Sequence, residues 1–302
     1  MLTNFIKQKD VKNKFKRWFE KPKIEKPKIL LSDNYNSSLI GNAVDYLIHA
    51  KYDYLYKKSG TNTLAFELIA KFEKVKSDFL KHDNPKHYYF TKNGSYIKNR
   101  SYNTGKVIKS SEVSFYRIIN LFEESLIFYN KFLINGKISE DFLKSILILA
   151  QIMPGIHYGK IGSMPGKVLK NDIKVLRKLI PIIPKEMFTK KISFLSSPNL
   201  SLGLIDGRPD YIFDDLLLEV KTTKAFFQLN DFYQIVGYYL LYLNKKKQYQ
   251  SNNIEVKRLG IYYILYGRII YFDPKSFFSK VKFNEVINWI NQRNKKYDYL
   301  YL

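Results

Sequence analysis

The spacing of apolar and polar residues predicts a helical first half of the chain and a strand-rich second half. In the first half, apolar side chains recur every three to four residues, the period of an amphipathic helix. Past residue 192 the apolar residues occur in short runs separated by glycine and polar pairs, which is typical of strands. Helices are expected at about 39–56, 61–82, 112–134, 139–153 and 168–180.

The segment 207–221 is expected to form a β-hairpin. Two apolar runs flank Asp214–Asp215, a polar pair that suits a two-residue turn. A turn there fixes the register of the two strands, because each residue before it faces the residue at the same distance after it. The expected pairs are Phe213 with Leu216, Ile212 with Leu217, Tyr211 with Leu218 and Asp210 with Glu219.

Asp210, Glu219 and Lys221 carry the candidate chemistry of this hairpin. Opposed residues on one sheet face have Cβ atoms about 4.5–5.5 Å apart, and two carboxylates that close repel unless a cation lies between them. Lys221 follows Glu219 by two positions and therefore points to the same face. The continuous run 216–218 indicates a strand buried on both faces, where charges need a partner or a metal. The alternative is a surface hairpin with ordinary solvated charges.

A helix over 227–243 is expected to follow the hairpin. Gln234 and Tyr238 are four residues apart in it and therefore share one helix face. They can belong to a functional site next to the hairpin or to an ordinary polar stripe. The rest of the pattern predicts a second hairpin, 259–266 with 268–272, and a closing helix over 274–294.

These motifs resemble the signature of the PD-(D/E)XK nuclease superfamily. Pro209–Asp210 and Glu219–Val220–Lys221 stand where that signature has its acidic residues and lysine. The Gln-x-x-x-Tyr of the next helix is similar to a motif of the RecB-like branch, which includes CRISPR adaptation nucleases and recombination exonucleases. The resemblance covers roughly residues 200–272 and 37–50. It implies an α/β, restriction-endonuclease-like core, with a central mixed sheet flanked by helices.

The resemblance also implies a metal cofactor, Mg²⁺ or Mn²⁺. Asp210 and Glu219 are the implied metal ligands, and the backbone carbonyl of Val220 is a further one. A metal at such a site lowers the pKa of a bound water and neutralises charge in the transition state. The expected reaction is hydrolysis of phosphodiester bonds.

Three more residues receive roles by the same resemblance. Lys221 is expected to orient the water or to stabilise charge at the scissile phosphate. Gln234 and Tyr238 are expected to steady Lys221 or to contact the backbone of the nucleic acid. DNA is the expected substrate, with RNA left open, as are exonuclease or endonuclease action, polarity and sequence preference.

A third metal ligand is expected on the helix that begins near Ser37–Ser38. RecB-like nucleases carry Gly-x-x-x-His there, but in this chain Gly41 is followed four positions later by Asp45. Aspartate is a hard oxygen ligand that suits Mg²⁺ or Mn²⁺, so Asp45 is the predicted ligand. His49, one turn later, is the alternative, and either residue can instead be an ordinary helix side chain.

Asp206 competes with Asp210 for the acidic position, because a Gly-x-x-Asp lead-in is common in RecB-like proteins. The expected register puts Asp206 opposite Thr223, at the far end of the hairpin. A bulge at Gly207 or Pro209 would change that count. Asp210 is therefore preferred as the ligand, and Asp206 is kept as a residue that supports the site.

Charge and cysteine content narrow the function classes. The chain of 302 residues has 51 Lys and Arg against 27 Asp and Glu, a formal net charge of +24, which favours a polyanionic partner such as nucleic acid. It contains no cysteine, which excludes disulfides, thiolate zinc sites and cysteine-ligated iron–sulfur clusters. This separates the chain from RecB-like relatives that carry a four-cysteine cluster.

The domain organisation expected from these patterns is a basic N-terminal arm over 1–30 and one nuclease domain over 31–302. The catalytic core takes about 37–56 and 192–272, and a helical insertion takes about 60–190. No secretory signal or bilayer-length apolar run is evident, so a cytoplasmic protein without a membrane partner is expected.

Each of two basic segments outside the core is open to two structural interpretations. Before the Lys-Pro-Lys repeats at 21–23 and 26–28, the first twenty residues suit a short amphipathic helix. A solvated, partly mobile terminus is preferred there to a nucleic-acid-binding arm. The segment 83–110 interleaves tyrosines with cations around a small hairpin at Asn93–Gly94, and it suits base stacking or an exposed loop equally.

The function expected overall is a metal-dependent deoxyribonuclease in repair, recombination or phage defence. The alternative is a non-catalytic nucleic-acid-binding protein, or an accessory subunit, that keeps the nuclease fold. The loss of a metal ligand would favour this alternative, and Asp210, Glu219 and Lys221 are all present. The chain has no helicase motor motif of its own, so a helicase or defence-system partner would be a separate protein.

Overall fold

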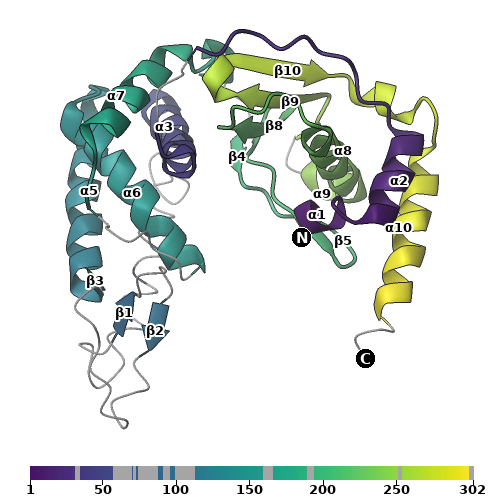
Figure 1. Ribbon diagram of the computed structural model, residues 1–302, viewed down its shortest axis with the longest axis horizontal. Helices are drawn as coiled ribbons and strands as arrows, with labels where there is room; N and C mark the ends of the chain where they lie inside the picture. The colour runs from purple at the N-terminus through teal and green to yellow at the C-terminus, as the bar shows by residue number, and fades with distance from the viewer. Residues whose placement is uncertain are drawn as a thin grey trace. The chain divides into compact units, whose positions relative to one another are not determined.

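The computed structural model divides into two compact units. One consists of Met1–Ser32 and Pro184–Leu302, and the other of Asp33–Ile183. We call them the αβ unit and the helical unit, and Figure 1 draws the elements of both. The structure describes residues 1–30, 35–56, 70, 73, 88–90, 96–98, 113–158, 166–188, 194–250 and 254–298.

The αβ unit is built on a mixed five-stranded sheet with the strand order β10-β9-β8-β7-β4. Neighbouring strands run antiparallel except β8 and β9, which are parallel. The expected mixed sheet is therefore confirmed at the level of α/β class. The strands are β4 (Phe194–Ser196), β7 (Tyr211–Phe213), β8 (Leu216–Lys221), β9 (Arg258–Tyr263) and β10 (Arg268–Phe272).

The β7–β8 hairpin has the predicted register. The pairs Tyr211–Leu218, Ile212–Leu217 and Phe213–Leu216 are all present. Asp214 occupies the turn with φ 48°, a left-handed conformation that aspartate tolerates. Because β7 and β9 flank β8, its leucines are buried, as their continuous run predicted. Each such side chain contributes about 1.5–3 kcal/mol of burial free energy.

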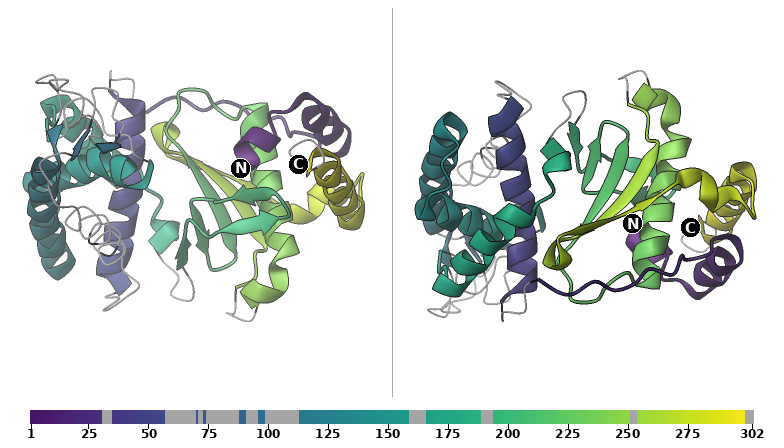
Figure 2. Two further views of the ribbon diagram at one scale, coloured as in Figure 1. Left: turned by 90° about the horizontal axis from the view of Figure 1, so that it is seen from below. Right: turned by 90° about the horizontal axis from the view of Figure 1, so that it is seen from above.

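Helix α8 (Leu229–Asn244) lies against one face of this sheet, as the views of Figure 2 show. A separate two-stranded ribbon of β5 (Leu200–Leu202) and β6 (Ile205–Gly207) packs on α8. A side chain at Gly207 would come within 2.9 Å of Tyr238 and Leu241, so glycine permits this close approach. The ribbon therefore lies close against the helix that carries Gln234 and Tyr238.

The N-terminal residues pack into the αβ unit through α1 (Leu2–Phe5) and α2 (Lys9–Trp18). Leu2, Phe5, Val11, Phe15 and Phe19 are buried, and Phe15 meets Tyr233 of α8 edge to face. A Cβ at Gly237 of α8 would lie 2.7 Å from Leu2. The expectation of a solvated terminus is thus wrong for these residues, because their apolar positions fit the surface of α8.

The C-terminal elements follow the prediction with shifted boundaries. The second hairpin pairs Arg268 with Tyr263, and a 3₁₀ turn at Ile264–Tyr266 takes the residues expected to extend its first strand. The closing helix α10 (Phe283–Asp298) begins later than expected, since Pro274–Phe278 form a 3₁₀ turn capped by Asp273. A short helix α9 (Lys246–Gln250) follows α8.

In the described part of the helical unit, four helices pack against one another. They match the predicted segments, but α6 runs on through Pro154, where it was expected to end. A proline keeps a helical φ and removes one hydrogen bond, so a helix can continue across it near its last turn. The helices are α3 (Ser37–Tyr56), α5 (Phe115–Asn135), α6 (Glu140–Tyr158) and α7 (Lys170–Leu179).

A small sheet in the helical unit pairs the two segments on either side of the predicted turn at Asn93–Gly94, and the turn itself lies outside the described residues. Strand β1 (Tyr88–Phe90) pairs antiparallel with β2 (Tyr96–Lys98) and with β3 (Val113–Ser114). The rest of the tyrosine-rich segment and all but two residues of the helix expected over 61–82 lie outside the described residues. Among the helices that the structure describes, none is both long and apolar enough to cross a membrane.

Candidate active site

Glu219 and Lys221 form an ion pair at the end of the central strand β8. Their side chains point to one face because they are two residues apart, and Lys221 Nζ lies 2.8 Å from Glu219 Oε1. Glu219 is 6% exposed. Charges this far from solvent are costly unless they are paired and hydrogen-bonded, so the contacts around this pair decide what it can do.

Gln234 and Tyr238 of α8 complete a hydrogen-bonded network with this pair. Gln234 Oε1 accepts from Lys221 Nζ at 2.8 Å, and its Nε2 donates to Glu219 Oε1 at 2.9 Å. The same Nε2 donates to the Tyr238 hydroxyl at 2.9 Å. The four-residue spacing predicted one shared helix face, and the structure turns that face toward β8.

Asp210 joins the network through the backbone of β8. It directly precedes β7, and its Oδ2 accepts a hydrogen bond from the Val220 N–H at 2.6 Å. The paired residues of β7 and β8 end at Tyr211 and Leu218, so Asp210 and Glu219 are the next residues of the same register. The sequence-predicted residues Asp210, Glu219, Lys221, Gln234 and Tyr238 therefore lie together in the αβ unit.

Burial and the neighbouring charges together shift the pKa of both members of the pair. Burial raises the pKa of Glu219 above its ordinary value, although the Lys221 ammonium acts in the opposite direction. Burial also disfavours the charged form of Lys221, but Glu219, Asp231 and Asp210 together outweigh it and raise the pKa of the lysine. Burial raises the pKa of Tyr238 as well, so its phenol stays protonated. At neutral pH Lys221 is an ammonium, not a base.

The second carboxylate oxygen of Glu219 is the feature of the network that points to a cation. Glu219 Oε2 is buried and has no hydrogen-bond partner, whereas Oε1 accepts from both Lys221 and Gln234. Asp210 supplies a second carboxylate beside it on the sheet. Oxygen donors of this kind fit Mg²⁺ or Mn²⁺. Among the described residues, however, no group of three or more His, Asp or Glu side chains is arranged to hold a metal.

Asp231 and Tyr263 belong to the surroundings of the site, and sequence reasoning missed them. The Tyr263 hydroxyl donates to Asp231 Oδ2 at 2.7 Å, and the same oxygen accepts from the Gln228 backbone N–H at 3.0 Å. Asp231 thus caps the first turn of α8, and its charge raises the pKa of Lys221. The signal in the sequence is the Gln-x-x-Asp spacing at the start of the helix, which is typical of a capping box.

Asp45 and His49 lie on α3 of the helical unit. Asp45 is half-buried and His49 is buried, and both have interaction partners. Asp210, Glu219, Lys221, Gln234 and Tyr238 all belong to the other unit. The assignment of Asp45 as a metal ligand therefore stays a prediction, and so does that of the Val220 carbonyl.

The predicted position of Asp206 opposite Thr223 is wrong. Asp206 pairs with Ser201 in the β5–β6 ribbon, because the chain leaves the five-stranded sheet between Gly207 and Asp210. Its Oδ1 lies 3.0 Å from the N-terminal amine of Met1, and its side chain is half exposed. Asp206 therefore makes an exposed ion pair with this amine and lies outside the β7–β8 hairpin.

Comparisons with known proteins do not identify the chain. No model of a protein family matches it. A search of curated proteins and a search of solved structures likewise return no match. Any function must therefore be argued from the residues and their geometry.

Proposed function

We propose that this chain is a metal-dependent nuclease that hydrolyses phosphodiester bonds, with DNA as its expected substrate. The observation that carries the proposal is the buried network of Glu219, Lys221 and Gln234, in which Glu219 Oε2 is left without a donor. A purely structural ion pair gains nothing from an unsatisfied buried carboxylate oxygen. A cation bound at that oxygen gives it a partner.

The metal would be held by Asp210, which directly precedes β7, and by Glu219 of the neighbouring strand β8. When bound, Mg²⁺ or Mn²⁺ would supply a water of lowered pKa and neutralise charge on the phosphate. Lys221 and Gln234 hold Glu219 by its other oxygen, which orients Oε2. The hydrogen bond from Val220 N–H holds one oxygen of Asp210 in the same way.

Lys221 is suited to stabilise charge. Neighbouring carboxylates raise its pKa, so the ammonium persists at neutral pH and can face the negative charge that develops on the phosphate. In the reaction, a water oxygen bonds to phosphorus and the phosphorus bond to the leaving oxygen breaks. The leaving oxygen takes up a proton and the attacking water loses one. By resemblance to the superfamily, the products are a 5′-phosphate and a 3′-hydroxyl.

A second candidate function is a nucleic-acid-binding protein that keeps this fold without catalysis. It is favoured by one observation, that the described part of the chain holds only two carboxylates at the site and no cluster of three metal-ligating side chains. The net charge of +24 suits this function equally well. Only a cleavage measurement separates the two.

The test is cleavage of linear and circular DNA, single- and double-stranded, by the wild-type chain and by Lys221→Ala. Each reaction is run with Mg²⁺, with Mn²⁺ and with EDTA. We expect metal-dependent cutting that is lost in Lys221→Ala, and the circular substrates separate endonuclease from exonuclease action. Lys224→Ala is the matched control, because it removes an exposed lysine three residues away. Folded wild-type protein that binds DNA but cuts none of these substrates would support the second candidate.

A further inference from the structure

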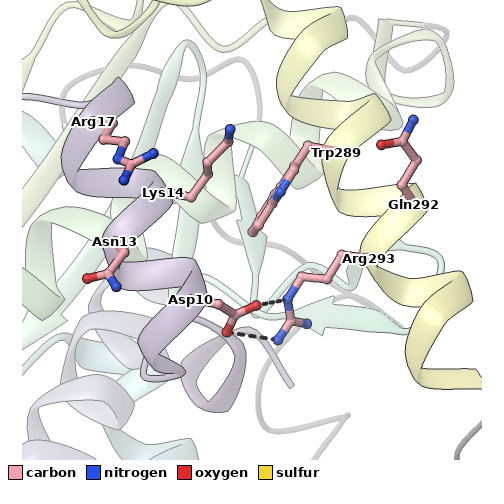
Figure 3. A pocket seen from close by; sticks show the side chains of 7 residues that line it. All are labelled: Asp10, Asn13, Lys14, Arg17, Trp289, Gln292 and Arg293. Carbon is pink, nitrogen blue, oxygen red and sulfur yellow. Dashed lines mark hydrogen bonds and ion pairs between the residues drawn. The ribbon is translucent and has the colours of Figure 1, made fainter.

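Helices α2 and α10 enclose a groove of about 500 Å³ on the αβ unit. We call it the α2–α10 groove. Figure 3 shows Lys14 and Trp289 extending toward each other across it from the two helices. Its volume lies in the range of small-molecule sites. The lining residues are Asp10, Asn13, Lys14 and Arg17 from α2, and Trp289, Gln292 and Arg293 from α10.

Two residues that line the groove, Asp10 and Arg293, form an ion pair. Arg293 donates to Asp10 from Nε at 2.6 Å and from Nη2 at 3.2 Å, and it also donates to Gln8. The Arg293 guanidinium further lies 5.1 Å from the Phe5 ring centroid. Asp10 is thereby neutralised by its partner, so the carboxylate does not offset the other cations of the groove.

Those cations are Lys14 and Arg17. Lys14 Nζ lies 4.7 Å from the Trp18 ring, and Arg17 is exposed. Neither is paired with a carboxylate among the described residues. The groove therefore carries two positive charges beside an indole, with the amides of Asn13 and Gln292 further out along the helices.

Another groove of the αβ unit, beside α9, differs in chemistry. Its described lining includes Lys245, Lys246 and Lys247 but no aromatic side chain. Lys246 lies 3.5 Å from Glu255, and Lys245 donates to the Asn199 carbonyl at 3.3 Å. The α2–α10 groove thus differs from the groove beside α9, because it combines an aromatic face with cations that have no acidic partner among the described residues.

We propose that the α2–α10 groove binds a segment of single-stranded nucleic acid. A nucleobase stacks on Trp289, and the flanking phosphates contact Lys14 and Arg17. Unpaired bases offer a face for stacking, and stacking on an aromatic side chain contributes about 1–3 kcal/mol per base. This inference rests on the proposed function and extends it, because it gives the nuclease a single-strand contact apart from the Glu219 network.

The chain offers a direct readout of this binding. It has two tryptophans, Trp18 and Trp289, whose ring centroids lie 5.4 Å apart in an edge-to-face contact, so its intrinsic tryptophan fluorescence reports on the groove. The experiment titrates full-length protein with a short thymidylate strand, in EDTA to prevent cleavage. We expect saturable quenching, and weaker binding of a duplex of the same length.

Charge-matched variants locate the contact. Lys14→Gln/Arg17→Gln is compared with Lys247→Gln/Lys275→Gln, which removes two exposed lysines elsewhere on the unit. The groove variant is expected to bind about tenfold more weakly than the control. Its slope of log affinity against log salt should fall by about 0.7 for each lost phosphate contact. Trp289→Phe keeps a stacking ring and should bind better than Trp289→Leu.

Three results would overturn the inference. These are equal affinity of the two double variants, binding without any change in tryptophan fluorescence, and binding of polyglutamate as tight as that of the strand. Because no step requires cleavage, the outcome is separate from that of the nuclease proposal. Groove binding without cutting would support this inference alone, and cutting with unaltered binding by the groove variant would support the nuclease alone.

Discussion

The relation between Glu219 and Lys221 is the central physical question at the scale of the residue. A buried ion pair is weak support for stability, since the desolvation of both charges offsets much of their attraction. Here Gln234 adds hydrogen bonds to both partners, yet Glu219 Oε2 still lacks a donor. A functional requirement for charged groups at this position therefore explains the arrangement better than a contribution to stability does.

Removing Lys221 should reveal the free-energy cost of burying the Glu219 carboxylate. Lys221→Met leaves a buried carboxylate without its cation, which we expect to lower the free energy of unfolding by about 3 kcal/mol. The loss should be larger at pH 8 than at pH 5. The pKa of Glu219 is already raised, so at the lower pH the folded protein can bind a proton there and avoid the unpaired charge. Urea unfolding at both pH values measures the effect.

The control for this prediction is the double variant Glu219→Gln/Lys221→Met. It removes both charges, so it should recover most of the lost stability. If the single and double variants unfold at the same urea concentration at both pH values, the unpaired Glu219 carboxylate does not destabilise the fold. The description of Glu219 as a buried charge would then be wrong.

The sequence allowed most of these residues to be chosen, for identifiable reasons. Two residues on one strand share a face when they are two apart, and two on a helix share a face when they are four apart, so spacing placed Glu219 with Lys221 and Gln234 with Tyr238. The choice of Gln234 and Tyr238 as site residues came from the resemblance to the nuclease superfamily. Asp206 was misplaced because counting along a hairpin assumes that the strand continues. The Asp231–Tyr263 contact joins residues 32 positions apart, and no local spacing predicts such a pair.

At the scale of the element, the N-terminal helices are the main departure from expectation. A basic, proline-containing terminus resembles a solvated arm, but its apolar residues are spaced to cover α8 and α10. Phe15 packs on Tyr233, and Trp18 packs on Trp289. The spacing of the apolar residues predicted a helix here. It could not predict the surface on which the helix packs, because that surface consists of residues more than two hundred positions later in the chain.

The Asp10–Arg293 pair should make the contact of α2 with α10 sensitive to acid. Its hydrogen bond and charge hold the pKa of Asp10 below its ordinary value of 3.8, so the pair stabilises the fold above that pH. This stabilisation is lost as pH falls through the lowered pKa. Because Asp10 is about half exposed, we expect about 0.5–1 kcal/mol.

The measurement compares wild type with Asp10→Asn by urea unfolding, followed through tryptophan fluorescence. The wild type should be the more stable at about pH 6, and the difference should shrink as the pH falls through the lowered pKa of Asp10. Glu285→Gln on α10 is the control for removing an acid without this ion pair. A difference between wild type and Asp10→Asn that stays constant with pH would contradict the assignment.

At the scale of the whole molecule, the chain forms two compact units, and the expected division into a catalytic core and a helical insertion stays a prediction. The expectation that α3 belongs with the catalytic core rested on the resemblance, whereas the compact units group α3 with α5, α6 and α7. The spacing of apolar residues predicts where helices occur. It does not predict which helices pack in the same core, since that depends on how well the shapes of their apolar faces fit together.

The excess of positive charge also belongs to this scale. A net charge of +24 draws the chain toward any polyanion, so binding of DNA by itself says little about catalysis. The central claim is therefore tested by chemistry at one residue whose replacement barely changes the charge or shape of the protein.

That measurement is the rate of DNA cleavage in Mg²⁺ by wild type and by Glu219→Gln. The substitution keeps the size of the side chain and removes the carboxylate that the proposal assigns to the metal. We expect wild type to cut only when metal is present, and the variant to be slower by about a hundredfold or more while binding DNA as tightly. Equal rates, or no cutting by folded wild-type protein in Mg²⁺ or Mn²⁺, would contradict the account.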